Sequence, residues 1–305
     1  MKKVIVTGAT GMIGISFIQE CILNNTDVVA VVRPKSSNLN RIPESEYVTI
    51  VECRLDNLSS LETLLDHSYD AFYHFGWEAT GKTGRQDAII QNKNIGYTLD
   101  AVKVAKKLGC QMFIGAGSQA EYGRLNMDKI SPASPINPEI AYGVAKYSAG
   151  KLSALLAKKK GIKHSWVRIF SVYGPYDNEN TMIMHAIDKM LKHEPTQFTK
   201  SEQTWDYLYS KDAGRALYLI GEFGRNQSVY CLGSGKTKVL SEYIEVIKSQ
   251  TDTPLATGVG ELPYAHNQVM NLCADITSLT RDTGFTPQIG FEEGIRRTME
   301  WCRLI

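Results

Sequence analysis

The sequence predicts an α/β protein in which a parallel β-sheet is covered by helices on both faces. Three observations lead to this prediction. Short apolar segments alternate with longer amphipathic ones up to about residue 170, a glycine-rich turn follows the first apolar segment, and the alternation fades after Tyr173-Gly174-Pro175. Parallel strands that alternate with helices require right-handed crossovers, which place helices on both faces of the sheet.

The first part of the chain carries the alternation. Strands are expected at residues 3–7, 28–32, 48–53, 71–75, 112–115 and 165–169, and helices at 12–24, 59–66, 87–108 and 140–160. This order is typical of a doubly wound parallel sheet, the Rossmann fold. We therefore predict a dinucleotide-binding domain over residues 1–174.

The rest of the chain, residues 175–305, is predicted to form a smaller C-terminal lobe that binds substrate over the carboxyl edge of the sheet. Short strands are expected at 207–209 and 229–232, and helices at 240–249, 276–283 and 292–301. No Pro/Gly/Ser-rich linker separates the two parts, so segments of the chain are free to cross between them.

The bulk composition limits the partners. The chain has 305 residues, of which 43% are hydrophobic and 22% charged, and its formal net charge is only +2. This balance gives no basis for a nucleic-acid or membrane surface. The apolar run after Lys3 ends at Thr7, and no window reaches the roughly 18 apolar residues of a membrane span. We therefore expect a cytoplasmic protein.

The six cysteines are far apart and form no CxxC pair, so we expect reduced structural thiols and no metal site. They are Cys21, Cys53, Cys110, Cys231, Cys273 and Cys302.

The glycine-rich turn predicts a phosphate-binding site. The first strand runs directly into Gly8-Ala9-Thr10-Gly11-Met12-Ile13-Gly14, and a helix follows. Glycines at this spacing allow a tight turn, a close approach of the backbone to a pyrophosphate and close packing of helix on strand. The amides at the helix start then face the anion. Gly8, Gly11, Met12, Ile13 and Gly14 are the predicted contacts, and a glycine-rich turn without a ligand is the alternative.

Two charged residues bear on the choice of dinucleotide. The second strand ends at Arg33, where an NAD enzyme usually has a carboxylate that accepts a hydrogen bond from the ribose 2′-hydroxyl. A guanidinium suits a 2′-phosphate instead, so NADP(H) is favoured and NAD(H) is the alternative. Arg33 as a solvated loop charge also stays open. Asp56 after the third strand is a candidate acceptor for the adenine amino group, or a helix N-cap.

A phenol and an ammonium predict acid–base chemistry. Tyr142 and Lys146 are four residues apart in a predicted helix and so share one face. A phenol ionises near pH 10, and a nearby lysine together with an oxidised nicotinamide lowers its pKa toward neutrality. Ser118 follows a central strand, where ligands of such sheets bind. Its hydroxyl suits the reacting oxygen of a substrate, and turn capping is the alternative role.

With these motifs in place, the chain resembles the extended short-chain dehydrogenase/reductases, the NAD-dependent epimerase/dehydratase family of nucleotide-sugar epimerases, dehydratases and 4-ketoreductases. The resemblance runs nearly end to end. The matching segments are residues 8–14, 74–76, 94–98, 118–123, 142–146, 168–175, 205–212, 274–279 and 292–295.

The resemblance assigns roles to individual residues. It implies that Tyr142 is the acid/base, that Lys146 orients the nicotinamide ribose and that Ser118 steadies the substrate oxygen. It also implies a set of residues that line the cofactor: Phe75, Gly76, Asn94 and Phe170.

The departures from the family pattern narrow the range of reactions that we expect. The dehydratases carry acidic residues two or three places before the tyrosine of the Tyr-Gly pair, where this chain has Gln119 and Ala120. Glu121 comes one residue later and, on extended backbone, would face the opposite side from Ala120. We therefore do not expect dehydration.

Further departures concern the nucleotide. Trp205 stands where an arginine is usual, Ser171 replaces a common asparagine, and residues 262–266 lack the usual arginine. Trp205 is a candidate for stacking on a base, or for burial in the small lobe. Together with Ser118 and Gln119, Ser171 and Trp205 are the predicted substrate contacts, and the identity of the nucleotide and sugar stays open.

The favoured function is reduction of a 4-keto nucleotide sugar by NADPH, with Tyr142 as the acid. A nucleotide-sugar 4-epimerase with retained NAD is the alternative, and a catalytically silent dinucleotide-binding sensor is a third. Many relatives pair two long helices into a homodimer, and residues 87–108 and 140–160 predict such a pair here, although these faces could equally be core.

Overall fold

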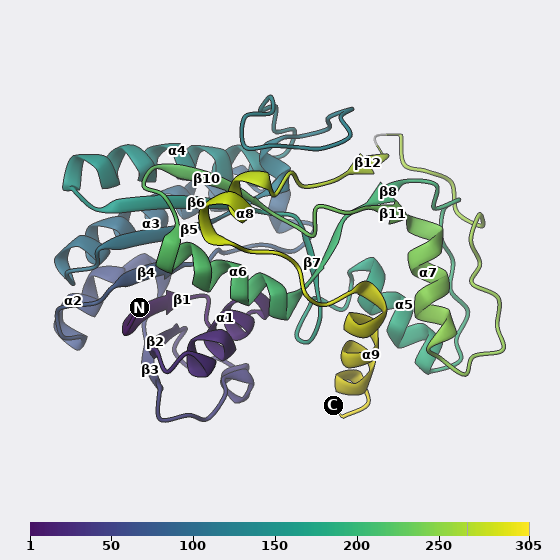
Figure 1. The fold of residues 1–305 in the computed structure, drawn as a ribbon, viewed down its shortest axis with the longest axis horizontal. Coiled ribbons are helices and arrows are strands. Elements are labelled where there is room, and N and C mark those ends of the chain that lie inside the picture. The colour runs from purple at the N-terminus through teal and green to yellow at the C-terminus, as the bar shows by residue number, and fades with distance from the viewer. Residues whose placement is uncertain (267, 305) are drawn as a thin grey trace.

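A seven-stranded sheet in which every pair of neighbours is parallel forms the centre of the molecule (Figure 1). The computed structural model describes residues 1–266 and 268–304. The strand order is β10-β6-β5-β4-β1-β2-β3. The strands are β1 (Lys3–Thr7), β2 (Asp27–Val32), β3 (Val48–Glu52), β4 (Ala71–His74), β5 (Met112–Ser118), β6 (Lys163–Ile169) and β10 (Ser228–Leu232). The predicted α/β class with a doubly wound parallel sheet is confirmed.

Helices cover both faces of the sheet (Figure 1). One layer contains α3 (Ala88–Lys107) and α4 (Ala141–Lys160), and the other contains α1 (Met12–Leu23), α6 (Ser210–Phe223) and α8 (Thr277–Thr283). Successive side chains of a strand point to opposite faces, so each strand contributes to two cores. In β1, Val4 and Val6 pack on the α1–α6 side, whereas Ile5 packs on the α3 side.

Short helical segments lie in the connections of the sheet. They are η1 (Leu39–Arg41), η2 (Leu55–Ser60), α2 (Leu61–Leu64), η3 (Gly84–Gln86) and η4 (Gln119–Glu121).

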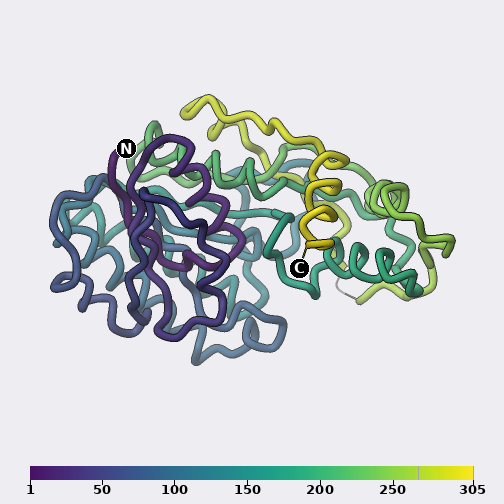
Figure 2. Tube along the Cα trace, turned by 90° about the horizontal axis from the view of Figure 1, so that it is seen from below, coloured from purple at the N-terminus to yellow at the C-terminus, as the bar shows by residue number. Residues whose placement is uncertain are grey.

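A smaller lobe lies beside the sheet, and Figure 2 shows it at the opposite end of the molecule from the N-terminus. Its helices α5 (Met182–Leu191), α7 (Leu240–Ser249) and α9 (Phe291–Cys302) share one hydrophobic core. In its small sheets, β8 (Thr204–Trp205) pairs with β11 (Lys238–Val239) and β12 (Asn271–Leu272), and β7 (Ser171–Tyr173) pairs with β9 (Tyr207–Tyr209).

The chain crosses between the two parts. Although residues 229–232 were predicted as a strand of the smaller lobe, β10 pairs with β6 in the main sheet. Helices α5 and α6 were not predicted. Helix α6 packs against α1 so closely that a Cβ on Gly214 would collide with the carbonyl oxygen of Ser16. The second half of the chain therefore completes the fold begun by the first.

No helix among the described residues is long and apolar enough to cross a membrane. All six cysteines are free thiols, and five of them are buried.

The close packing of α1 on α6 generates a prediction about stability. Gly214→Ala should lower the free energy of unfolding by about 1–3 kcal/mol, because the added methyl group overpacks a rigid helix contact. Gly96→Ala on α3 is the matched control, because a Cβ there would meet nothing within 4 Å. That change should raise stability by about 0.5–1 kcal/mol through helix propensity. Urea denaturation measures both, and equal effects of the two changes would contradict the packing argument.

Candidate active site

The carboxyl edge of the sheet opens beside β1, where the strand order changes direction. Strand β1 lies between β2 and β4, and the crossovers from it and from β3 leave toward opposite sides. Such a switch point is where open α/β sheets bind ligands. Here two backbones meet closely: Gly8 has φ +70°, and a Cβ on it would lie 2.7 Å from the amide nitrogen of Gly76. Only glycine fits at residue 8 without strain.

The turn after β1 leads into a helix start that is free to bind an anion. Gly11 is the N-cap of α1, no side chain caps this helix, and its first turn has no acidic residue. Met12 and Ile13 are therefore the first residues of a helix end whose amides lack a side-chain acceptor. A Cβ on Gly14 would collide with the Gly8 carbonyl oxygen, so the turn lies directly on the helix. These residues fit the pyrophosphate of a dinucleotide.

Arg33 and Asp56 follow the ends of β2 and β3. Arg33 is exposed, and no ion pair to it is found among the described residues. Asp56 lies inside η2, whose N-cap is Arg54, so Asp56 does not cap this helix. Its carboxylate accepts a hydrogen bond from Arg54 Nε at 3.0 Å, and this hydrogen bond lowers the pKa of Asp56.

The other residues predicted to line the cofactor shape the edge of the sheet. Asn94 is buried and ties down the segment after β4: it accepts a hydrogen bond from the Glu78 amide at 2.8 Å and donates one to the Glu78 carbonyl at 3.1 Å. The Phe75 ring packs edge-on against Phe17 in the core. The Gly76 amide donates to Thr7 Oγ1 at 3.2 Å.

Phe170 is also buried, with its ring centroid 6.2 Å from that of Tyr122. Its amide donates to the Leu232 carbonyl, next to β10.

The structure brings Ser118, Tyr142 and Lys146 together. Ser118 ends β5, and Tyr142 and Lys146 lie in the first turns of α4. The Ser118 hydroxyl is close enough to the Tyr142 phenol to favour its ionised form. Ser118 also caps η4, because its Oγ accepts a hydrogen bond from the Ala120 amide at 3.1 Å. Both of the roles considered for this serine are therefore compatible with its position.

Burial dominates the electrostatics of the tyrosine and the lysine. Tyr142 is only 7% exposed, and burial raises the pKa of its phenol, whereas the charge of Arg85 and the nearby Ser118 hydroxyl act in the opposite direction. Burial also lowers the pKa of Lys146 to about 7. Its Nζ donates to the Ala116 carbonyl at 2.6 Å. In the protein alone, the neutral forms of both groups are thus favoured.

Two residues beside this group were not singled out from the sequence: Trp77 and Arg85, between β4 and α3. The Trp77 ring lies 3.7 Å from Lys146 Nζ and meets the Tyr142 ring edge-on, with centroids 6.0 Å apart. The Arg85 guanidinium carbon lies 4.7 Å from the centre of the Tyr142 ring. Their position in a loop at the carboxyl end of a strand could have identified them from the sequence, because functional residues concentrate in such loops.

Glu121 is fully buried and engaged by other groups. Its Oε2 accepts a hydrogen bond from Arg168 Nε at 2.7 Å, and its Oε1 accepts one from Trp166 Nε1 at 2.9 Å. The expectation of extended backbone here was wrong, since residues 119–121 form η4, a consequence of the capping of this turn by Ser118. Both carboxylate oxygens are nevertheless occupied by these partners, so we assign Glu121 no role in acid–base chemistry.

The predicted substrate contacts Gln119 and Trp205 line one cavity of about 210 Å³, together with Arg124, Ile140 and Asn271 among others. The Trp205 indole donates to Ser171 Oγ at 2.8 Å, so these two predicted contacts are bonded to each other. The side-chain oxygen of Gln119 is buried and has no hydrogen-bond partner in the protein. This cavity therefore offers an unused polar group.

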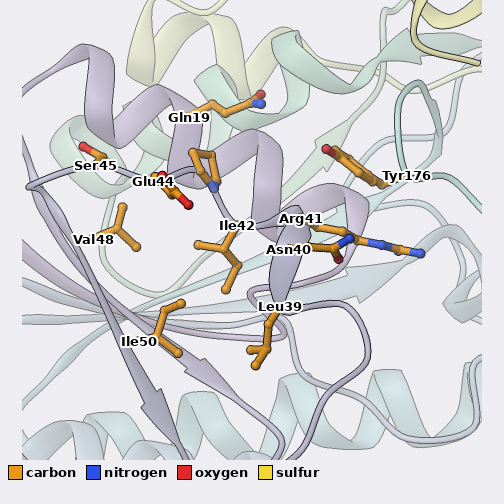
Figure 3. A pocket seen from close by; sticks show the side chains of 11 residues that line it. Gln19, Leu39, Asn40, Arg41, Ile42, Glu44, Ser45, Val48, Ile50 and Tyr176 are labelled. Carbon is orange, nitrogen blue, oxygen red and sulfur yellow. The ribbon is translucent and has the colours of Figure 1, made fainter. Parts of the chain in front are cut away.

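A second cavity, of about 790 Å³, lies between α1, the segment 39–45 and β3 (Figure 3). Tyr176 and Arg41 flank it, with the guanidinium carbon 5.5 Å from the centre of the ring. None of the predicted site residues lines this cavity.

Comparison with known proteins identifies the family. The model of the NAD dependent epimerase/dehydratase family matches residues 4–233, and the chain therefore belongs to this family. A putative UDP-glucose 4-epimerase of Methanocaldococcus jannaschii is 27% identical over 98% of both chains. Several dTDP-glucose 4,6-dehydratases are also similar. The predicted resemblance is thus confirmed.

Solved structures of low identity share the fold. The UDP-glucose 4-epimerase of Thermotoga maritima, solved with UDP-glucose, has a TM-score of 0.89, 22% identity and 99% coverage of both chains. The UDP-glucuronic acid 4-epimerase of Bacillus cereus, solved in complex with NAD, has a TM-score of 0.82 and 22% identity, with 99% of this chain and 96% of that chain covered.

The free helix start predicts the effect of a single methyl group. Gly11→Ala should weaken binding of NAD by about tenfold or more, because Gly11 is the uncapped N-cap of α1 and an added methyl group would take up space beside a bound pyrophosphate. A Cβ there meets no protein atom closer than 3.5 Å, so the fold itself should tolerate the change. Gly290→Ala is the matched control, since Gly290 is also an uncapped helix N-cap in extended conformation. Isothermal titration calorimetry measures both. Unchanged affinity in Gly11→Ala would show that the pyrophosphate does not bind here.

The buried ammonium predicts a pH-dependent stability. Because the pKa of Lys146 falls from 10.5 to about 7 on folding, the unfolded chain binds the extra proton between these values, and stability falls as the pH is lowered from 10.5 to 7. Lys146→Met should therefore raise the free energy of unfolding most at pH 7 and below, by roughly 2–4 kcal/mol, and little near pH 10.5.

Chemical denaturation across this pH range tests the prediction, with Lys159→Met as the control because Lys159 is an exposed lysine on the same helix. A gain that does not depend on pH in Lys146→Met would mean that the buried lysine keeps its proton.

Proposed function

We propose that this protein is a nucleotide-sugar 4-epimerase that retains NAD. The observation that carries the proposal is the grouping of Ser118, Tyr142 and Lys146 at the carboxyl edge of the sheet, with no ionisable group at residues 119 and 120. The end-to-end similarity to proteins named as UDP-sugar 4-epimerases supports the epimerase over the reductase that the sequence favoured.

The proposed mechanism assigns one task to each residue. The amides of Met12 and Ile13 would hold the pyrophosphate of NAD, and Lys146 would hydrogen-bond its nicotinamide ribose. Bound NAD supplies a hydride acceptor for the substrate C4. The phenolate of Tyr142 takes the proton of the C4 hydroxyl and later gives it back, while Ser118 holds the same oxygen. Inversion at C4 would require the 4-keto sugar to turn over within the site before it is reduced again.

The nucleotide sugar is proposed to extend from this centre toward the 210 Å³ cavity. Gln119 lies beside Ser118 in the sequence and supplies the unused buried oxygen, which suits a sugar hydroxyl or an amide donor. Trp205 offers an aromatic face, while its indole nitrogen is held by Ser171. Ser171 then acts by fixing Trp205 rather than by contacting the substrate. Two relatives are named as UDP-sugar 4-epimerases, which supports UDP as the nucleotide, whereas others are named for dTDP-glucose.

A second candidate function is the reduction of a 4-keto nucleotide sugar by NADPH. Arg33 supports this candidate, because an exposed guanidinium directly after β2 suits a 2′-phosphate. In this reaction the hydride goes to C4 and Tyr142 gives its proton to the oxygen in a single direction.

A homodimer through α3 and α4 also stays a proposal. Large apolar side chains are exposed on these two helices, which supports a partner surface there. They are Ile89, Val144, Leu152 and Leu155.

Cofactor content and turnover test the function together. Purified protein should release NAD on denaturation and interconvert UDP-glucose and UDP-galactose, or another 4-epimeric pair of UDP-sugars, with no added cofactor, as read by mass spectrometry. Tyr142→Phe should lower turnover by about 10²–10⁴-fold and leave NAD binding intact, because only the acid/base is removed. Tyr147→Phe on the same helix is the matched control and should keep full activity.

Other outcomes select the other functions. Protein without bound dinucleotide that oxidises NADPH in the presence of a 4-keto nucleotide sugar would replace the epimerase with the reductase. Bound dinucleotide with no turnover of any sugar would leave the silent sensor.

A further inference from the structure

We propose that Arg85 is a positioning residue for Tyr142: its guanidinium lies against the phenol ring and stabilises the phenolate that takes the substrate proton. The inference rests on the proposed function only in taking Tyr142 as the acid/base.

The position of Arg85 is fixed by the loop that carries it. Its Nε donates to the Thr80 carbonyl at 2.8 Å. The loop is tied to α3 by Gln91, whose Nε2 donates to the carbonyls of Ala79 and Gly84 at 3.0 and 2.9 Å. Gln91 Oε1 in turn accepts from the Trp77 indole at 2.8 Å. One buried amide thus anchors both residues that lie beside the Tyr142 ring.

Arg85 has no carboxylate partner among the ion pairs of the described residues. Its charge is therefore uncompensated on the protein side. At 4.7 Å between the guanidinium carbon and the ring centre, it interacts with the face of the Tyr142 ring, and this attraction strengthens when the phenol becomes an anion.

The sequence predicted that Lys146 lowers the pKa of Tyr142, but Lys146 is less suited to this effect than Arg85. Its Nζ lies 5.6 Å from the centre of the Tyr142 ring, farther than Arg85, and it is engaged by the Ala116 carbonyl and the Trp77 face. With a pKa of about 7, Lys146 carries only part of its charge at neutral pH. A guanidinium stays charged at every pH that a protein tolerates.

The other groups around Tyr142 do not replace this charge. Burial raises the pKa of the phenol. Arg85 is the largest influence that lowers this pKa and the Ser118 hydroxyl is the next, whereas Glu121 raises it. Glu121 is paired with Arg168. Burial and the charge of Lys146 lower the pKa of His74 to about 3, so this imidazole is neutral.

The test is a titration of the tyrosine that needs no turnover. With NAD bound, tyrosinate absorbance near 295 nm is recorded against pH for the wild type and Tyr142→Phe, and the difference reports Tyr142. Arg85→Gln should move this transition up by about one pH unit, and the acidic limb of the kcat profile by the same amount, which lowers kcat about tenfold below the transition. Arg85→Lys should restore part of the shift, and Lys82→Gln, an exposed charge on the same loop, should cause none.

Three results would overturn the proposal. The first is a rise in KM with an unmoved titration, which would make Arg85 a substrate ligand. The second is an equal shift in Lys82→Gln, which would reflect general surface charge. The third is a melting temperature of Arg85→Gln lowered by more than about 3 °C, which would make this exposed side chain structural. Since the titration requires only NAD, it remains valid if the epimerase assignment fails.

Discussion

The buried carboxylate of Glu121 is the interaction on which the geometry of the site depends. It accepts hydrogen bonds from the Ser118 amide, the Trp166 indole and the Arg168 guanidinium, and so joins the end of β5 to β6. Removing one partner of such a pair leaves an uncompensated buried charge, which is far more costly than losing a surface ion pair. Because Glu121 also completes the capping of η4, it fixes the backbone at Ser118.

The same carboxylate opposes the ionisation of Tyr142. A fixed negative charge below Tyr142 disfavours its phenolate, and burial acts in the same direction. Arg168 pairs with this carboxylate, and the Arg85 guanidinium lies over the Tyr142 ring. The phenolate is therefore stabilised only when cations gather around the ring. If the protein binds an oxidised nicotinamide as proposed, its positive charge would favour the phenolate further.

The sequence predicted those parts of the site that depend on local spacing. Gly8 could be identified from the glycine spacing, and its close approach to Gly76 explains why no side chain fits there. Tyr142 and Lys146 could be identified because four residues make about one helical turn. Trp77 and Arg85 were missed because their contacts depend on how Gln91 folds the loop onto α3, which no periodicity encodes.

Helices α5 and α6 were missed for a related reason. Neither has a side-chain N-cap, and α6 begins immediately after β9, inside a segment that matched a family motif. Their boundaries follow from packing, such as the contact of Gly214 with α1, rather than from local signals. The position of β10 in the main sheet likewise depends on tertiary packing, because a short apolar strand can pair at any free edge of matching polarity.

Under the proposed function, the side chains beside Tyr142 support the transfer of a hydride and a proton at one carbon. Elimination of water would need a second acid or base beside the tyrosine. Two carboxylates neighbour the substrate candidates: Glu121 is paired with Arg168, and Glu139, at the 210 Å³ cavity, accepts a hydrogen bond from Arg124 at 2.8 Å. Each of these carboxylates is therefore engaged by an arginine. Gln119 and Ala120 cannot ionise, which favours the proposed epimerase over a dehydratase.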